Sequence, residues 1–384
     1  YIFMKNRGNA FIAGLMLTMP IVAGAQQTEP LTGYSRLFDD GKQLFMRHDY
    51  AAARQTMMRY MDLGKCAEFA DEAEYMLVCT AYELQMPDRI EKLEAYLEKH
   101  PESRYKNRVQ ALIASSYFFD KEYLKAIACY RGCDFDALGN EERDDNVYRL
   151  AQSYLEIGNT EEATAWLTVL KEASTKYSDD ATYSLAYIDY SAGRYDSAMK
   201  GFSSVKDNKN YAELAPYYMA DISLITGDYA AARNMALKYL NDYPKNEKSL
   251  EMKRIAGEAA YSQRDYTAAV NCLSPYCNET SNPQRNALYK LGMSYFNTQV
   301  YSEAAENLGR VTGADDDMSQ NAYLHMGLAY LNLKERNQAR MAFEQAAASN
   351  RNMQIKEQAL YNYALCTHET SYSPFAESVT VFER

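Results

Sequence analysis

The chain has 384 residues, 47% of them hydrophobic, and a formal net charge of −11. This length and apolar content suffice for a folded protein of two or three ordinary domains. The acidic balance argues against nucleic-acid binding, because that binding relies on lysine and arginine clusters that neutralise phosphates.

The first 25 residues have the three-part pattern of a secretory signal peptide. Lys5 and Arg7 form a basic head, residues 10–22 form an apolar run, and Ala23-Gly24-Ala25 supplies small residues for cleavage. The apolar run is shorter than the roughly 20 residues that a membrane-spanning helix needs. The alternative interpretation is a buried N-terminal helix. We expect export, cleavage after residue 25, a mature formal charge of −13 and a location in the periplasm or cell envelope.

A self-similar pattern fills most of the remaining chain. An alanine recurs seven times at intervals of 34 to 37 residues, and another small residue stands twelve positions before each of these anchors. A larger, usually apolar residue follows four positions after the anchor. These spacings place residues on one face of a helix and let two helices approach closely. The anchors are Ala126, Ala163, Ala198, Ala232, Ala269, Ala304 and Ala339, and the preceding small residues are Ala114, Ala151, Ala186, Ala220, Gly257, Gly292 and Gly327.

Short turns separate the two helices that each period predicts. The turns at residues 156–159, 191–194 and 226–228 contain Gly158, Gly193 and Gly227. Glycine or asparagine there suits the residue after a helix end, and a following Asp or Ser suits the start of the next helix.

Two antiparallel helices in about 34 residues resemble the tetratricopeptide repeat when a small residue stands at position eight, tyrosine at eleven, alanine at twenty and proline at thirty-two. The fullest match here runs through Leu291, Gly292, Tyr295, Tyr301, Ala304 and Leu308, and the next through Gly327, Tyr330, Ala339 and Phe343. With the expected signal peptide, the chain is similar to the secreted repeat proteins of Bacteroidota.

The resemblance implies an all-α fold, a right-handed α-solenoid of about ten antiparallel helix pairs. A signal peptide at 1–25 and a short linker at 26–33 precede a repeat array at 34–384. The last unit stops partway through its second helix, so we expect a longer protein or a partner that covers this end. The units lie near 34–64, 68–101, 107–136, 144–174, 179–208, 213–244, 250–278, 285–314, 320–349 and 357–384.

In the repeat family the first helices line the concave wall and contact partners through positions two, five, nine and twelve. A tyrosine-rich wall suits recognition, because each ring offers a large rigid area and a polar tip. Two alternatives remain: the rings pack between helices, or they stack on neighbouring units. The candidate partner-binding residues are Tyr148, Tyr183, Tyr187, Tyr190, Tyr217, Asp221, Arg254, Glu258, Tyr289, Met293 and Phe296.

Carboxylates on the same face favour a partner with basic or amide-rich segments; they are Asp145, Asp180, Asp221 and Glu258. We therefore expect a non-catalytic scaffold that binds peptide segments or a partner protein, with no nucleic acid and no evident small-molecule substrate. The alternative is the N-terminal repeat region of a larger exported enzyme or envelope assembly machine. Glycan binding ranks last, because sugar sites favour paired aromatic platforms and the chain has one tryptophan, Trp166.

The sequence predicts no catalytic, cofactor or metal site. It contains no phosphate-binding glycine loop, nucleophile elbow or H-E-x-x-H helix. The cysteine pairs 129/133 and 272/277 lack the further ligands that zinc requires, so we interpret them as small buried residues and leave their oxidation open. The acidic run at 315–317 lacks the spacing of an EF-hand and suits a helix start.

Overall fold

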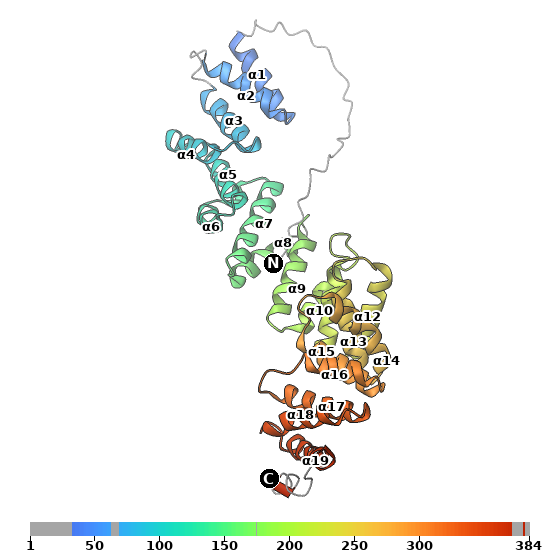
Figure 1. The fold of residues 1–384 in the computed structure, drawn as a ribbon. Coiled ribbons are helices and arrows are strands. Elements are labelled where there is room, and N and C mark those ends of the chain that lie inside the picture. The colour runs from blue at the N-terminus through green and yellow to red at the C-terminus, as the bar shows by residue number, and fades with distance from the viewer. Residues whose placement is uncertain (1–32, 63–68, 174, 371–378, 381–384) are drawn as a thin grey trace. The chain divides into compact units, whose positions relative to one another are not determined.

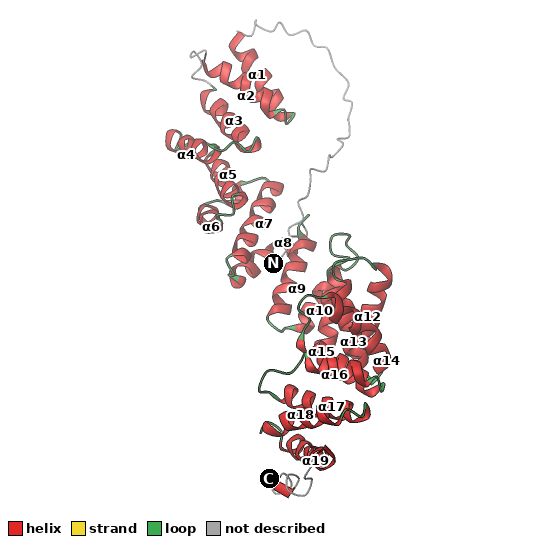
Figure 2. Ribbon diagram, in the orientation of Figure 1, coloured by secondary structure: helices red, strands yellow, loops and turns green. Residues whose placement is uncertain are grey.

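The structure is a computed structural model, and it describes residues 33–62, 69–173, 175–370 and 379–380. Figure 1 traces these helices from blue at the N-terminus to red at the C-terminus. Figure 2 shows that, throughout these described ranges, the regular structure is helical. The expected all-α architecture is therefore confirmed. The predicted signal peptide and linker, at residues 1–33, lie almost wholly outside the described residues.

The chain divides into two compact units, residues 1–116 and residues 117–384. The first unit contains two helix pairs and most of α5. Its helices are α1 (Gly33–Met46), α2 (Tyr50–Asp62), α3 (Ala70–Glu83), α4 (Arg89–Lys99) and α5 (Lys106–Phe119), which continues past the boundary.

The second unit contains six consecutive helix pairs after α6, followed by α19. The helices are α6 (Tyr123–Arg131), α7 (Asn140–Glu156), α8 (Thr160–Glu172), α9 (Ser178–Ser191), α10 (Tyr195–Val205), α11 (Ala215–Ile225), α12 (Tyr229–Asp242), α13 (Ser249–Ser262), α14 (Tyr266–Glu279), α15 (Arg285–Asn297), α16 (Tyr301–Gly309), α17 (Asp317–Asn332), α18 (Arg336–Ala348) and α19 (Met353–Thr370), with a 3₁₀ turn at Phe135–Ala137.

The two helices of a pair have different environments. In the second unit each first helix contacts its own second helix and also the first helix of the next pair, from α9 through α19. The first helices therefore form one layer. This explains why α13 is buried on most sides, whereas α12 buries a single stripe.

Small residues permit the close approach of the two helices in a pair. All seven anchor alanines are fully buried. A Cβ atom added to Gly292 would lie 2.7 Å from Leu308 Cγ, and one added to Gly327 would lie 2.5 Å from Phe343 Cε1. Such distances are shorter than side chains tolerate, so only glycine fits at these two positions without movement. The predicted pairing of small and bulky residues is confirmed.

The turn between the two helices of a pair has the same backbone form throughout the described array. A residue with positive φ ends the first helix of nine pairs. Glycine occupies three of these positions, as the sequence indicates, and the other six carry side chains: His48, Gln85, Lys121, Arg264, Gln299 and Lys334. In two of the glycine-containing turns the next residue caps the following helix. Asn159 accepts from the amide of Glu162 at 3.2 Å, and Asp228 accepts from the amide of Ala231 at 3.0 Å.

Candidate functional site

The candidate residues all lie on first helices of the second unit. Tyr148 belongs to α7, and each of the next four first helices contributes two or three more: Tyr183, Tyr187 and Tyr190 on α9, Tyr217 and Asp221 on α11, Arg254 and Glu258 on α13, and Tyr289, Met293 and Phe296 on α15. Because consecutive first helices contact each other, residues about 31 to 33 positions apart can meet.

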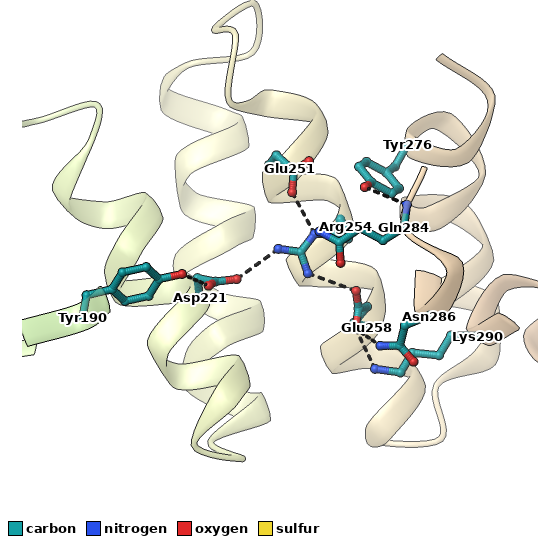
Figure 3. Close-up of polar contacts among 9 residues, drawn as sticks. All are labelled: Tyr190, Asp221, Glu251, Arg254, Glu258, Tyr276, Gln284, Asn286 and Lys290. Carbon is teal, nitrogen blue, oxygen red and sulfur yellow. Dashed lines mark hydrogen bonds and ion pairs between the residues drawn. The ribbon is translucent and has the colours of Figure 1, made fainter. Parts of the chain in front are cut away.

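Arg254 is the centre of a polar network on this layer (Figure 3). Its guanidinium donates to Asp221 at 3.0 Å, to Glu251 at 2.8 Å and to Glu258 at 3.0 Å. Burial opposes the charge of this guanidinium, but the carboxylates of Glu251 and Glu258 prevail and raise its pKa. The side chains of Arg254, Asp221 and Glu258 are only 8%, 10% and 4% exposed.

The network continues to the helices on either side. Tyr190 of α9 donates its hydroxyl to Asp221 at 2.6 Å, and burial followed by this hydrogen bond raises the pKa of Tyr190. On the other side, Lys290 and Asn286 of α15 donate to Glu258 at 2.6 and 2.9 Å. One chain of polar contacts therefore joins four consecutive first helices, α9, α11, α13 and α15.

A pocket of about 390 Å³ opens beside this network. Asp221, Arg254, Glu258 and Lys290 form its charged side, with Ser262, Gln284 and Asn286 next to them. A second side is apolar and consists of Leu224, Ile225 and Tyr229, at the turn between α11 and α12. The volume lies within the usual range of small ligand pockets, about 300–1,000 Å³.

Two of the candidate tyrosines are engaged by the array itself. Tyr148 stacks on Tyr177 with ring centroids 4.3 Å apart, and Tyr183 stacks on Tyr211 at 4.4 Å. Tyr177 lies directly before α9, and Tyr211 lies shortly before α11. The hydroxyl of each donates to an acidic residue of the preceding first helix, α7 or α9. Tyr177 donates to Asp145 at 2.8 Å, and Tyr211 donates to Asp180. The expected alternative of stacking between neighbouring units is confirmed at these two positions.

The remaining aromatic candidates are half-buried. Tyr187 packs edge-on against Tyr218, with ring centroids 5.6 Å apart. The ammonium of Lys248 lies 5.5 Å from the centroid of Tyr217. Tyr289 donates to the side chain of Asn321 at 3.0 Å, and Phe296 lies edge-on to His325 at 5.2 Å. Met293 is buried.

The four carboxylates expected to attract a basic partner already have partners in the chain. Lys176 and Tyr177 bind Asp145, Tyr211 binds Asp180, and the Arg254 network holds the other two. A cation therefore neighbours three of the four carboxylates, whereas Asp180 accepts from a neutral hydroxyl, and the preference for basic segments stays a prediction.

Sequence reasoning missed several residues of this site. Lys290 stands at repeat position six, which is not a contact position of the family, and Asn286 stands at position two but was not among the candidates. The apolar residues of the pocket lie at the turn between α11 and α12, outside the contact positions. The residue Lys290 could have been found by its separation of 32 positions from Glu258, because one repeat period brings equivalent residues of successive first helices together.

Other expectations concern metals, cysteines and the acidic run. Within the described ranges, no group of three His, Cys, Asp or Glu residues could hold a metal ion, and no helix is long and apolar enough to cross a membrane. The thiol of Cys133 donates to the carbonyl of Cys129 at 3.4 Å. Asp316 caps α17 by accepting from the amide of Ser319 at 2.8 Å, so the predicted helix start is confirmed.

Two segments match models of the tetratricopeptide repeat, residues 286–314 and residues 320–353. They correspond to the two units with the fullest repeat pattern, so the resemblance is confirmed there and the chain carries tetratricopeptide repeats in these segments. No curated protein sequence matches the chain.

Several solved structures are similar to the chain, at low identity and with low TM-scores. A tetratricopeptide repeat protein from Parabacteroides merdae is 14% identical, with a TM-score of 0.39, over 86% of this chain and 98% of that one. YrrB, described as a TPR protein with an unusual peptide-binding site, is 18% identical, with a TM-score of 0.42, over 50% and 96%. Yeast Tom70 is 12% identical, with a TM-score of 0.34, over 90% and 99%. These values leave the function of this chain to be inferred from its own residues.

Proposed function

We propose that the protein is a non-catalytic interaction scaffold that binds a peptide segment of a partner protein on its layer of first helices. The observation that supports this most directly is the pocket of about 390 Å³ between α11, α13 and α15, where charged, amide and apolar side chains from three repeats converge. Tetratricopeptide repeats in the adjacent segments favour the same role.

The location is part of the proposal. The basic head, apolar run and small residues of positions 1–25 favour export, so the scaffold would act in the periplasm or cell envelope. Expression in a Gram-negative host followed by N-terminal sequencing of the periplasmic fraction tests this. A mature chain beginning at Gln26 is expected, and an intact N-terminus in the cytosol would refute export.

Site-specific photo-crosslinking tests the binding role. A photoreactive amino acid replaces Ser262, which lines the pocket, or Leu237, which is 44% exposed on α12. We expect the residue at position 262 to capture a defined protein through one identifiable segment, and the residue at position 237 not to do so. A synthetic peptide of that segment should then compete with the crosslink. Equal capture at both positions would contradict binding on the first-helix layer.

A further inference from the structure

The charged side of the pocket is electrically balanced. Its two carboxylates, Asp221 and Glu258, lie within 3.0 Å of nitrogen atoms of Arg254, and Glu258 also receives Lys290 at 2.6 Å. The four formal charges that line the pocket therefore sum to zero, and Glu251, which also accepts from Arg254 at 2.8 Å, lies outside the lining. A charged side chain entering the pocket would lose its hydration beside ions that are already paired, without a compensating field.

The apolar side of the pocket has exposed side chains that a ligand could cover. Ile225 is 49% exposed and Tyr229 is 37% exposed, and Leu224, which is half-buried, lines the pocket with them. Covering such side chains removes apolar surface from water, worth about 25 cal/mol per Å². An aliphatic side chain is the complement of this side.

Amide side chains supply hydrogen-bonding groups at the pocket. Gln284 and Asn286 are both exposed there. The backbone amide of Gln284 donates to the Tyr276 hydroxyl at 3.3 Å, and the Asn286 side chain donates to Glu258, so both residues are held in place (Figure 3). A primary amide both donates and accepts, which matches the alternating groups of an extended peptide backbone.

We propose that this pocket takes an uncharged, extended peptide segment, with an aliphatic side chain against Leu224, Ile225 and Tyr229 and its backbone on Gln284 and Asn286. This deepens the proposed function and rests on it, because it names the chemistry of the segment that the scaffold binds. It also excludes acidic and basic segments as preferred occupants of this pocket.

The test uses three fluorescent, end-capped heptapeptides that share a Gly/Ser/Asn frame and differ at the central residue, which is Leu, Lys or Glu. Fluorescence anisotropy with the full mature chain measures binding. We expect the Leu peptide to bind at least about tenfold more tightly than the other two, as burial of one leucine side chain would give. Between 50 and 500 mM salt its affinity should change little, because the Leu peptide carries no charge and the pocket lining holds as many cations as carboxylates.

Matched variants locate the effect. Ile225→Asp should weaken the Leu peptide at least about tenfold, whereas Ile157→Asp, at a turn with a side chain of similar exposure (40%), should leave it unchanged. Lys290→Met leaves the pocket lining with one net negative charge, so it should shift preference toward the Lys peptide. Circular dichroism verifies that each variant keeps its helical content.

The outcomes separate the two proposals. Tighter binding of the Lys or Glu peptide to the wild type, or no binding of the Leu peptide, overturns the inference. Equal binding by Ile225→Asp and the wild type also overturns it, while the scaffold proposal stands on the crosslink at position 262. If the crosslink captures nothing in that position, the scaffold proposal itself fails.

Discussion

Two neighbouring segments of the second unit build the same helix pairs with different chemistry. In residues 140–214, the aromatic segment, stacked tyrosines join one pair to the next. In residues 215–332, the ionic segment, the joints are Arg254 with Asp221, Lys290 with Glu258, and Arg285 with Asp316. The backbone repeat therefore does not dictate which interaction joins successive pairs.

The two kinds of joint differ in how they fail. Loss of a stacked ring removes apolar contact and leaves a cavity. Loss of one member of a buried ion network leaves charges without partners, which costs more than the pair itself contributes. The ionic segment should therefore be the more sensitive to single substitutions.

The largest effect is expected for Arg254→Met. It leaves Asp221 buried without its cation and Glu258 with Lys290 alone, so the free energy of unfolding should fall by about 3–5 kcal/mol in urea titrations. Arg194→Met is the control, because Arg194 is 57% exposed in its pair with Asp189 and should cost less than about 1 kcal/mol. Adding Asp221→Asn to Arg254→Met should recover part of the loss, because Asp221 is the carboxylate left without a cation. Equal losses of unfolding free energy in Arg254→Met and Arg194→Met would show that the buried network stabilises the fold no more than an exposed ion pair does.

Tyr183→Ala tests the aromatic segment. The ring is 7% exposed and packs on Tyr211 and Phe202, so its removal should cost about 3 kcal/mol of unfolding free energy. Tyr183→Phe keeps the stacked ring and should cost less than about 1 kcal/mol. If both variants lose the same unfolding free energy, the hydroxyl group rather than the stacked ring makes the stabilising contribution.

The two segments should respond to opposite ends of the pH scale. Hydrogen bonds from Arg285 and Ser319 lower the pKa of Asp316, so its contribution is present above the unfolded-state pKa near 4 and is lost as the pH falls below it. Burial, and then the bond to Asp180, raises the pKa of Tyr211. Its contribution is therefore present below the unfolded-state pKa near 10 and is lost as the pH rises above it.

Urea unfolding at pH 3, 5, 8 and 11 measures both effects. Asp316→Asn should flatten the loss between pH 5 and 3, and Tyr211→Phe should flatten the loss between pH 8 and 11. An Asp316→Asn variant as acid-sensitive as the wild type would contradict the assignment of that ion pair.

The smallest effect concerns the turns, which both segments share. Gly193→Ala in the aromatic segment places a Cβ at φ 74° and should cost about 1 kcal/mol. Arg264→Gly in the ionic segment relieves the same strain at φ 62°, but glycine adds unfolded-state entropy, so a gain of about 0.5 kcal/mol is expected. Thermal unfolding of the two variants should shift in opposite directions, and a destabilised Arg264→Gly would show that the side chain has another role.

Much of the fold could be predicted because helix pairing is local. The anchor alanines and the small residues before them mark the contact line within each pair, and the structure buries the anchors fully. Glycine correctly indicated the turns at Gly158, Gly193 and Gly227. The same positive φ at Lys121 and Gln299 could not be predicted, because lysine and glutamine are not residues that indicate this backbone conformation.

The candidate site was predictable as a face but not as a set of contacts. Tyr148 stands where a partner-binding ring is expected, yet it stacks on Tyr177 because the connection before α9 returns across α7. The sequence does not give the path of that connection. Likewise, the charge of Glu258 could be counted from the sequence, whereas its neutralisation by Arg254 and Lys290 depends on how three helices are rotated against each other.

Helices in the described part of the second unit contact either the next helix or the next but one. Such a chain closes only short loops as it folds, and short loop closures favour fast folding. No pair needs a distant strand or helix to complete its core, so folding can begin at any pair and spread in both directions. Amide hydrogen exchange along the array should accordingly be graded, slowest in the well-buried α13 and faster toward the end pairs.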